Sequence, residues 1–208
     1  MIKLSEQDIF YNFLLDGKQN EDGHSILDTI YWVRRNGCVL VQFCPYVGKL
    51  NQTKIEGKVC LRFVTYQQID LKLDLKFKKE KLKSNGKLLE AKIRRAPVAA
   101  QIFWSEEIAN LKGDVIYSGP EHADAFKKEE YHAIIIVGYG QEMIKRKLVK
   151  YWVVRNSHGE AWGKGGYGKI NRAPCHGKLL IDIAWVLAGI TYEDPDGKRY
   201  PNAIGNSG

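Results

Sequence analysis

The sequence predicts an α+β fold, with helices in the first part of the chain and strands in the rest. Apolar residues recur at helical spacing in segments before residue 96, and the later part consists of short apolar or aromatic runs separated by glycine-containing turns. Helices followed by strands are typical of α+β folds, here with the strands in an antiparallel barrel or sheet. A chain of 208 residues has the length of one domain or of two small lobes and can bury a substantial core.

The first helices are predicted from the signals at their ends. Residues 1–10 can begin a short helix, and a second helix follows Ser25, whose hydroxyl suits an N-cap, with Asp28 at the capping-box position. Its apolar residues recur at helical spacing as far as Asn36-Gly37, which is a helix-stop signal. The sequence therefore places an amphipathic helix between Ser25 and Gly37.

The rest of the chain is predicted to be mostly extended. Residues 39–46 are apolar with a proline near their end, which favours an extended segment, and residues 59–77 alternate in polarity, which favours one or two strands. Residues 87–95 predict a helix that stops before Pro97, because the residue preceding a proline avoids helical geometry. The polar segment after Tyr192 is predicted to be disordered. Further strands are predicted at 98–103, 115–117, 133–139, 151–155 and 167–170.

Composition excludes several classes of function. The formal net charge of +8 comes partly from lysines in residues 72–92, where charged and apolar residues alternate. A solvated strand face explains this alternation at least as well as a nucleic-acid footprint, and without a recognised binding module no nucleic-acid partner is expected. The four cysteines form no CxxC pair and have no histidines at zinc-ligand spacing, so a structural metal site is not expected. With no signal-peptide core and no window of membrane-spanning length, the chain as written is expected to stay in the cytosol, without a membrane partner.

Two segments of the later part indicate a catalytic site. His132 stands at the start of the strand segment AIIIVGYG, and Asn156 ends the next one, YWVVRN. Taken singly, His132 is more typical of a satisfied histidine at a strand end, and Asn156 of a turn residue. Together they fit a chemical need, because an imidazole that accepts a proton from a thiol on one nitrogen must donate from the other to a fixed acceptor. The thiol then ionises as an imidazolium–thiolate pair.

The residues around this pair resemble a known family. HAIIIVGYG is similar to the histidine motif of the papain-family cysteine proteases, and NSHGEAWGKGGYGKI is similar to their asparagine motif, N-S-W-G-x-x-W-G-x-x-G-Y. Ala96-Pro97-Val98 resembles the G-P-V segment of that family. Weaker landmarks in the family's order are Leu4-Ser5-Glu6-Gln7, Asn36-Gly37 and Pro45-Tyr46. The resemblance implies a papain-like two-lobe fold with an incomplete helical lobe and connecting segment at 1–95, a β-barrel lobe at 96–192 and a polar tail at 193–208.

The resemblance also assigns roles to individual residues. It implies that His132 and Asn156 are catalytic, that Gly23 and Ala133 line the substrate cleft, and that Trp162 supports the site. It implies hydrolysis of peptide bonds by Cys-His-Asn catalysis, without a metal or cofactor, by a monomer that acts on a peptide or protein substrate. His158 stands where the family has a tryptophan that shields the His-Asn hydrogen bond, so that bond is expected to be wetter and weaker.

The nucleophile of the family is the part that the resemblance does not supply. It lies in a C-G-[SA]-C-[WY] context that precedes L-S-E-Q, so it would fall before Met1. None of Cys38, Cys44, Cys60 and Cys175 has that context. The chain as it stands is therefore expected to be inactive. Two alternatives remain open: a pseudoprotease that binds peptides or a cystatin-like inhibitor without cleavage, and a decayed relic that folds poorly. Localisation stays open as well, since the family is usually lysosomal, vacuolar or secreted.

Overall fold

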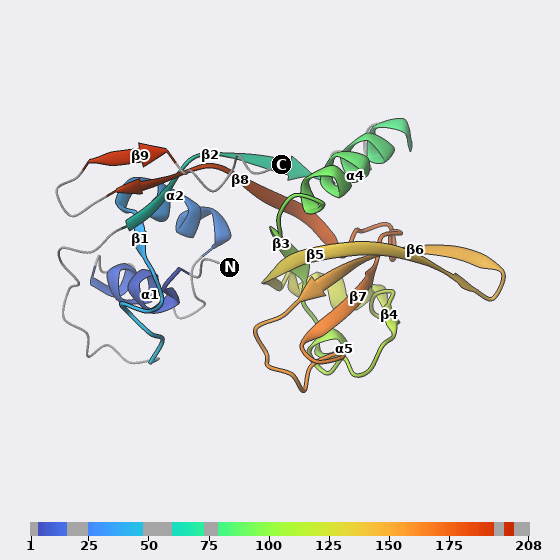
Figure 1. Cartoon of the computed structure of the whole chain (residues 1–208). Helices are drawn as coiled ribbons and strands as arrows, with labels where there is room; N and C mark the ends of the chain where they lie inside the picture. The colour runs from blue at the N-terminus through green and yellow to red at the C-terminus, as the bar shows by residue number, and fades with distance from the viewer. Residues whose placement is uncertain (1–3, 16–24, 48–59, 73–78, 194–197, 202–208) are drawn as a thin grey trace. The chain divides into compact units, whose positions relative to one another are not determined.

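The structure divides the chain into two compact units. It is a computed structural model that describes residues 4–15, 25–47, 60–72, 79–193 and 198–201 (Figure 1). One unit comprises residues 1–66 and 187–208, and the other comprises residues 67–186. The boundary predicted between residues 95 and 96 separates the two lobes that the resemblance implies, and not these compact units. It stays a prediction.

Among its described residues, the first unit contains helices α1 and α2 and several strand pairings. Helix α1 (Glu6–Leu15) begins after Ser5, whose Oγ accepts the N–H of Asp8 at 2.9 Å. Helix α2 (Ile26–Asn36) has Ser25 as its N-cap, and Gly37 at φ +79° donates its N–H to Val33 O, so the predicted helix and both of its end signals are confirmed. Among the other elements, β1 (Cys38–Val39) pairs antiparallel with β2 (Cys60–Asp70), and β9 (Arg199–Pro201) pairs antiparallel with the end of β8 (Ile181–Glu193).

Two predictions for this unit are wrong. Residues 39–46 do not form one extended segment, because the chain turns after Leu40, whose carbonyl accepts the N–H of Phe43 at 2.9 Å. The residue before α1 holds the turn, since the Ser5 hydroxyl donates to Cys44 O at 2.6 Å, a long-range contact that an apolar run does not reveal. The segment after Tyr192 contains the strand β9, so it is not disordered throughout its described part.

The second unit is built on a mixed sheet with the strand order β2-β8-β3-β5-β6-β7-β4. The pairings β3–β5, β3–β8, β5–β6 and β6–β7 are antiparallel, whereas β4 pairs with β7 in parallel. The predicted antiparallel barrel is therefore corrected: the sheet is mixed, and in the described residues its order continues from β2 to β1 and ends at β4 on the other side, without closing. The strands not yet given are β3 (Val98–Phe103), β4 (Ile116–Tyr117), β5 (Tyr131–Ile144), β6 (Lys147–Arg155) and β7 (Tyr167–Asn171).

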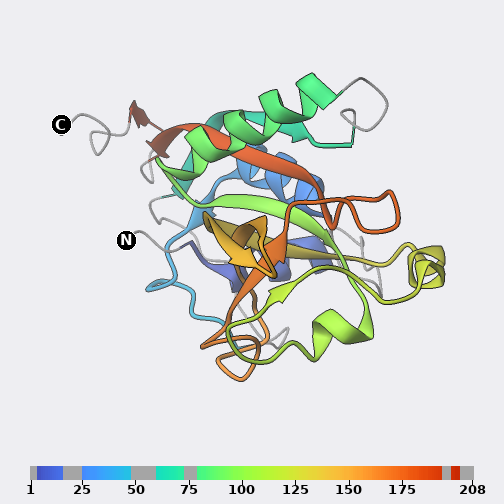
Figure 2. The ribbon, with the colours of Figure 1, turned by 90° about the vertical axis from the view of Figure 1, so that its right-hand side faces the viewer.

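Helices flank this sheet. Helix α4 (Lys79–Ile93) runs beside β8, while the short α5 (Glu106–Ala109) lies toward the opposite end of the sheet (Figures 1 and 2). A 3₁₀ helix, η1 (Ala123–Lys128), precedes β5. The predicted helix at 87–95 is thus the second half of α4, which begins earlier than its sequence signals indicate. In the described part of the chain, none of the helices is both long enough and apolar enough to span a membrane.

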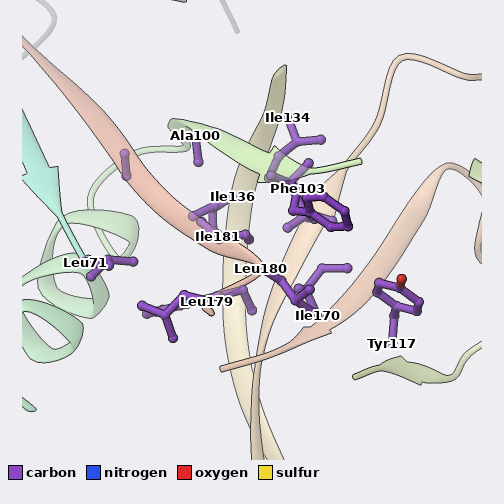
Figure 3. Close-up of a cluster of buried hydrophobic side chains, with 14 of the residues drawn as sticks. Leu71, Ala100, Phe103, Tyr117, Ile134, Ile136, Ile170, Leu179, Leu180 and Ile181 are labelled. Carbon is purple, nitrogen blue, oxygen red and sulfur yellow. The ribbon is translucent and has the colours of Figure 1, made fainter. Parts of the chain in front are cut away.

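The core of the second unit lies between the sheet and these helices. Alternate residues of β3 face inward, and Ala100 and Ile102 have no exposed surface. Ile136 of β5 and Ile170 of β7 are equally buried, and Leu89 joins them from α4. Figure 3 shows apolar side chains from several strands converging on this cluster. Truncating one such isoleucine or leucine to alanine costs roughly 2–5 kcal/mol, so the cluster holds the strand ends in place.

Candidate active site

The pairing of strands brings His132 and Asn156 together. His132 is the second residue of β5, and Asn156 directly follows β6. In the β5–β6 pair Ile135 lies opposite Arg155, so both residues stand at the same end of these strands. Nε2 of His132 lies 2.8 Å from Oδ1 of Asn156. The sequence predicts this pair, and the two residues meet at hydrogen-bonding distance.

The carboxamide oxygen of Asn156 determines which ring nitrogens of the two neighbouring histidines carry a hydrogen. It accepts from Nε2 of His132, from the backbone N–H of Ser157 at 2.7 Å and from Nδ1 of His158 at 3.0 Å. Because an amide oxygen only accepts, each facing ring nitrogen carries its hydrogen. Neutral His132 is therefore the Nε2–H tautomer, with its lone pair on Nδ1. Asn156 is 7% exposed, and its Nδ2 is buried without a hydrogen-bond partner in the described part of the chain.

Trp104 lies over the two histidines. Its ring centroid is 4.3 Å from that of His132 and 5.1 Å from that of His158, and the two imidazoles are 5.1 Å apart in an edge-to-face arrangement. Trp104 follows the last residue of β3, and its backbone N–H donates to Glu130 O at 2.9 Å. The indole that follows β3 thus packs on the imidazole, beside His158, where the resemblance implies a tryptophan.

Sequence reasoning missed Trp104. The signal that could have found it is strand register: Phe103 pairs with Tyr131, so the residue after Phe103 stands beside the start of β5 and hence near His132. That register is a long-range pairing and is not written in the local sequence. We expected a wetter, weaker His-Asn hydrogen bond because His158 replaces a tryptophan. In the structure the indole of Trp104 lies over His132, a contact that this expectation did not include.

Burial sets the acid–base character of His132. The side chain is half-buried, and burial is the largest cause that lowers its pKa from the ordinary value of 6.5. The hydrogen bond to Asn156 acts in the opposite direction and raises the pKa, while the neighbouring His158 lowers it further. The net pKa is lowered, so His132 is a neutral imidazole at pH 7 with Nδ1 able to accept a proton.

Trp162 supports Asn156 through the turn that follows it. Its indole is buried, and Nε1 donates to Ile108 O at 2.8 Å. The carbonyl of Trp162 accepts the N–H of Gly166 at 2.9 Å, and the carbonyl of Gly166 accepts the N–H of Asn156 at 3.0 Å. Gly168 leaves room for the indole, because a Cβ there would lie 2.6 Å from the ring. These hydrogen bonds link Trp162 to the backbone of Asn156 through Gly166.

The two residues predicted for substrate binding have different outcomes. Ala133 lies in β5 next to His132, is exposed and pairs with Gln101 of β3. Gly23 lies outside the described residues. The structure therefore places Ala133 at the same strand end as the pair.

The described cysteine side chains make contacts of their own. Cys38 and Cys44 are buried, and Sγ of Cys38 lies 3.4 Å from Ser5 O. Sγ of Cys175 lies 3.6 Å from Pro120 O, and burial raises the pKa of that thiol, which opposes formation of a thiolate. The side chain of Cys60 lies outside the described residues. Across the described ranges, no three His, Cys, Asp or Glu side chains are grouped to hold a metal ion.

Relatives of known sequence match much of the chain. A mouse (Mus musculus) protein, cathepsin 7, is 29% identical over 178 residues, which are 83% of this chain and 48% of that protein. The chain thus spans about half the length of this curated relative.

Solved structures show the same fold. The proform of the ragweed pollen cysteine protease Amb a 11 matches with a TM-score of 0.64 and 24% identity, over 90% of this chain and 52% of that one. The Carica candamarcensis cysteine protease CMS1MS2, solved in complex with E-64, matches with a TM-score of 0.59 and 22% identity, over 90% of this chain and 78% of that one. At these identities the likeness shows a papain-like fold.

The family model described as papain family cysteine protease matches residues 1–182. That match contains both strands that carry the His-Asn pair. Because it covers most of the chain, the chain belongs to the papain family of cysteine proteases.

Proposed function

We propose that this chain supplies the histidine and asparagine of a Cys-His-Asn site that hydrolyses peptide bonds in protein substrates. The observation that carries the proposal is the 2.8 Å contact between Nε2 of His132 and Oδ1 of Asn156, which leaves Nδ1 of a neutral imidazole free to take a proton. A thiol presented to Nδ1 would give up its proton there. The thiolate would attack the substrate carbonyl, and the imidazolium, held by Asn156, would then protonate the leaving amine.

The proposal assigns the nucleophile to a C-G-[SA]-C-[WY] segment, which does not occur within these 208 residues. It follows that the 208 residues by themselves do not form an acyl-enzyme. Ala133 and Gly23 are proposed to line the substrate cleft. The helical segments of residues 1–95 are proposed to be an incomplete helical lobe, and residues 96–192 to be the lobe that carries the pair.

A non-catalytic role is the second candidate. It applies if no thiol from outside these residues reaches His132, because the thiol of Cys175 contacts a backbone carbonyl and has a raised pKa, which opposes its use as a nucleophile. In that case the chain binds peptides or a cystatin-like inhibitor without cleaving them.

Hydrolysis of a fluorogenic dipeptide by the purified chain separates these candidates. The proposal expects no hydrolysis by the 208 residues, and hydrolysis that depends on His132 and is blocked by a thiol-directed epoxide once the C-G-[SA]-C-[WY] segment is present. Sequencing a transcript across the region before Met1 tests whether it encodes that segment. His132→Ala is the matched inactive control. Tight binding of a cystatin-like inhibitor by the chain, together with no hydrolysis even when that segment is present, would favour the non-catalytic role instead.

A further inference from the structure

A second site is suggested by a cavity of about 510 Å³ in the unit of residues 67–186. It lies between α4, strand β6, the end of β7 with the segment that follows it, and the start of β8. Sites for small molecules have volumes of about 300–1,000 Å³, so the cavity is large enough to hold one. Neither His132 nor Asn156 lines it. Its apolar wall includes Leu71, Trp152 and Leu180.

Arg172 is the polar group held at this wall. Its Nη1 donates to Glu90 Oε1 at 2.6 Å, and its guanidinium carbon lies 4.0 Å from the centroid of the Trp152 ring. Gly86 of α4 makes space for the group, because a Cβ at that position would lie 2.9 Å from Nη2. The side chain is only 17% exposed. The guanidinium is therefore packed in one orientation by an acid, an aromatic face and a glycine.

The same guanidinium has hydrogen-bonding capacity to spare. It carries five N–H donors, and Glu90 is the hydrogen-bond partner of its side chain in the described part of the chain. Neither Nε nor Nη2 of Arg172 is fully buried, because a fully buried donor without a partner would be an unsatisfied polar atom, and neither of these atoms is one. Since Arg172 lines the cavity, these donors are accessible from it. Two N–H groups in one plane are the geometry that binds a carboxylate with two parallel hydrogen bonds.

Charge around the cavity favours an anion. Lys87, Lys147 and Lys150 also line it, and all three side chains are exposed. Within its described lining, Glu90 is the only acidic residue, and it is already paired with Arg172. An ion pair that served only to join α4 to the sheet would need neither an apolar cavity nor a basic rim.

We propose that this cavity binds a small amphipathic carboxylate. The carboxylate accepts from the free donors of Arg172, and the apolar body lies against Trp152 and Leu180. The lysines of the rim add attraction that salt screens.

The test is isothermal titration of the full chain with decanoate and, as the uncharged match, decanol. Saturable binding of decanoate at one site, at least about tenfold tighter than that of decanol, is expected. Arg172→Lys keeps the charge but removes the planar fork, and should weaken decanoate binding about tenfold. Lys127→Gln, an exposed lysine of η1 that does not line the cavity, is the matched control and should leave the affinity unchanged.

Gly86→Ala is a second variant that does not depend on the ion pair. Alanine favours the helix, while its Cβ displaces Nη2 of Arg172 and should weaken decanoate binding. Thermal unfolding of each variant establishes that it is folded. No saturable binding of decanoate would overturn the proposal. So would equal binding of decanoate and decanol, or an unchanged affinity in both Arg172→Lys and Gly86→Ala.

Discussion

Asn156 and His132 show how much of a site one side chain can determine. The carboxamide oxygen receives three N–H donors, so it fixes the tautomers of His132 and His158 at once. Each residue was predicted from its motif, because the spacing of a strand, a turn and a strand is local. Trp104 was not predicted, because its contact with His132 depends on the pairing of β3 with β5.

Trp104→Ala should raise the pKa of His132. Burial is the largest cause of the lowered pKa, and removing the indole admits water to the imidazole. An NMR titration of the His132 ring protons would measure the midpoint. Met143→Ala, an exposed change farther along β5, should leave the midpoint unchanged. A midpoint that falls or stays constant in Trp104→Ala would show that the indole does not keep water from the ring.

At the scale of elements, local signals were sufficient for some segments and not for others. The limits of α2 follow from Ser25 and Gly37, and β3 has its predicted bounds, since these signals lie within a few residues. The parallel pairing of β4 with β7 and the turn after Leu40 depend on contacts between distant segments. A local pattern holds no information about such contacts, and these were the features predicted incorrectly.

Gly168→Ala should destabilise the turn that holds Asn156. Its Cβ would lie 2.6 Å from the Trp162 ring, and overpacking of this kind costs about 1–3 kcal/mol. Urea unfolding would measure the loss. Gly138→Ala on β5 is the matched control, because its Cβ would meet Val153 at 3.5 Å, an ordinary contact. Equal stability of the two variants would mean that the indole of Trp162 moves aside at little cost.

Trp162→Phe tests the hydrogen bond of the same support. It removes the donor to Ile108 O, which still accepts the N–H of Leu111 at 3.2 Å, so the expected cost is that of one hydrogen bond, about 0.5–1.5 kcal/mol in the free energy of unfolding. The same variant should broaden the His132 resonance, because the turn that orients Asn156 loses its anchor. A loss of stability without any change at His132 would limit Trp162 to a role in packing.

At the scale of the whole molecule, the chain is a member of its family that spans about half the length of its curated relatives. The family and the α+β class could be predicted from sequence, because motifs and element order are properties of the chain itself. Closure of the sheet could not, since it depends on which strands meet at its edges.

A cooperative thermal unfolding transition is expected for the isolated chain. The core of residues 67–186 buries residues from most of its strands and from α4, which is the basis of all-or-none unfolding. Near-UV circular dichroism during heating would measure the transition. A gradual loss of signal with strong binding of a hydrophobic dye would support the reading of a relic that folds poorly.

The stability of the whole chain should depend on pH in two opposite ways. The lowered pKa of His132 means that the unfolded state binds the proton more readily, so stability present above pH 6.5 is lost as the pH falls through the folded pKa. Burial raises the pKa of Asp182, so its charge destabilises the fold above that pKa and the penalty disappears as the pH falls through it.

Asp182→Asn isolates the second effect. It should raise the unfolding free energy at pH 7 or leave it unchanged, because its partner Lys72 is 49% exposed and is not left buried without a counter-charge. Urea unfolding at several pH values would measure the unfolding free energy as a function of pH. The part of its pH dependence that Asp182 causes should be absent in the variant. A large loss of stability at pH 7 would show that the Lys72 pair outweighs the cost of burial.

The position of Trp104 also gives this chain an optical property. A protonated imidazole quenches the fluorescence of an indole in contact with it, and the ring of Trp104 is 4.3 Å from that of His132. Emission from Trp104 should therefore fall as His132 gains its proton, and Trp104→Phe should abolish that change. A thiol brought to Nδ1 would turn the same imidazole into an imidazolium at neutral pH. Binding of the thiol at Nδ1 would then be detected as a decrease in the fluorescence of Trp104.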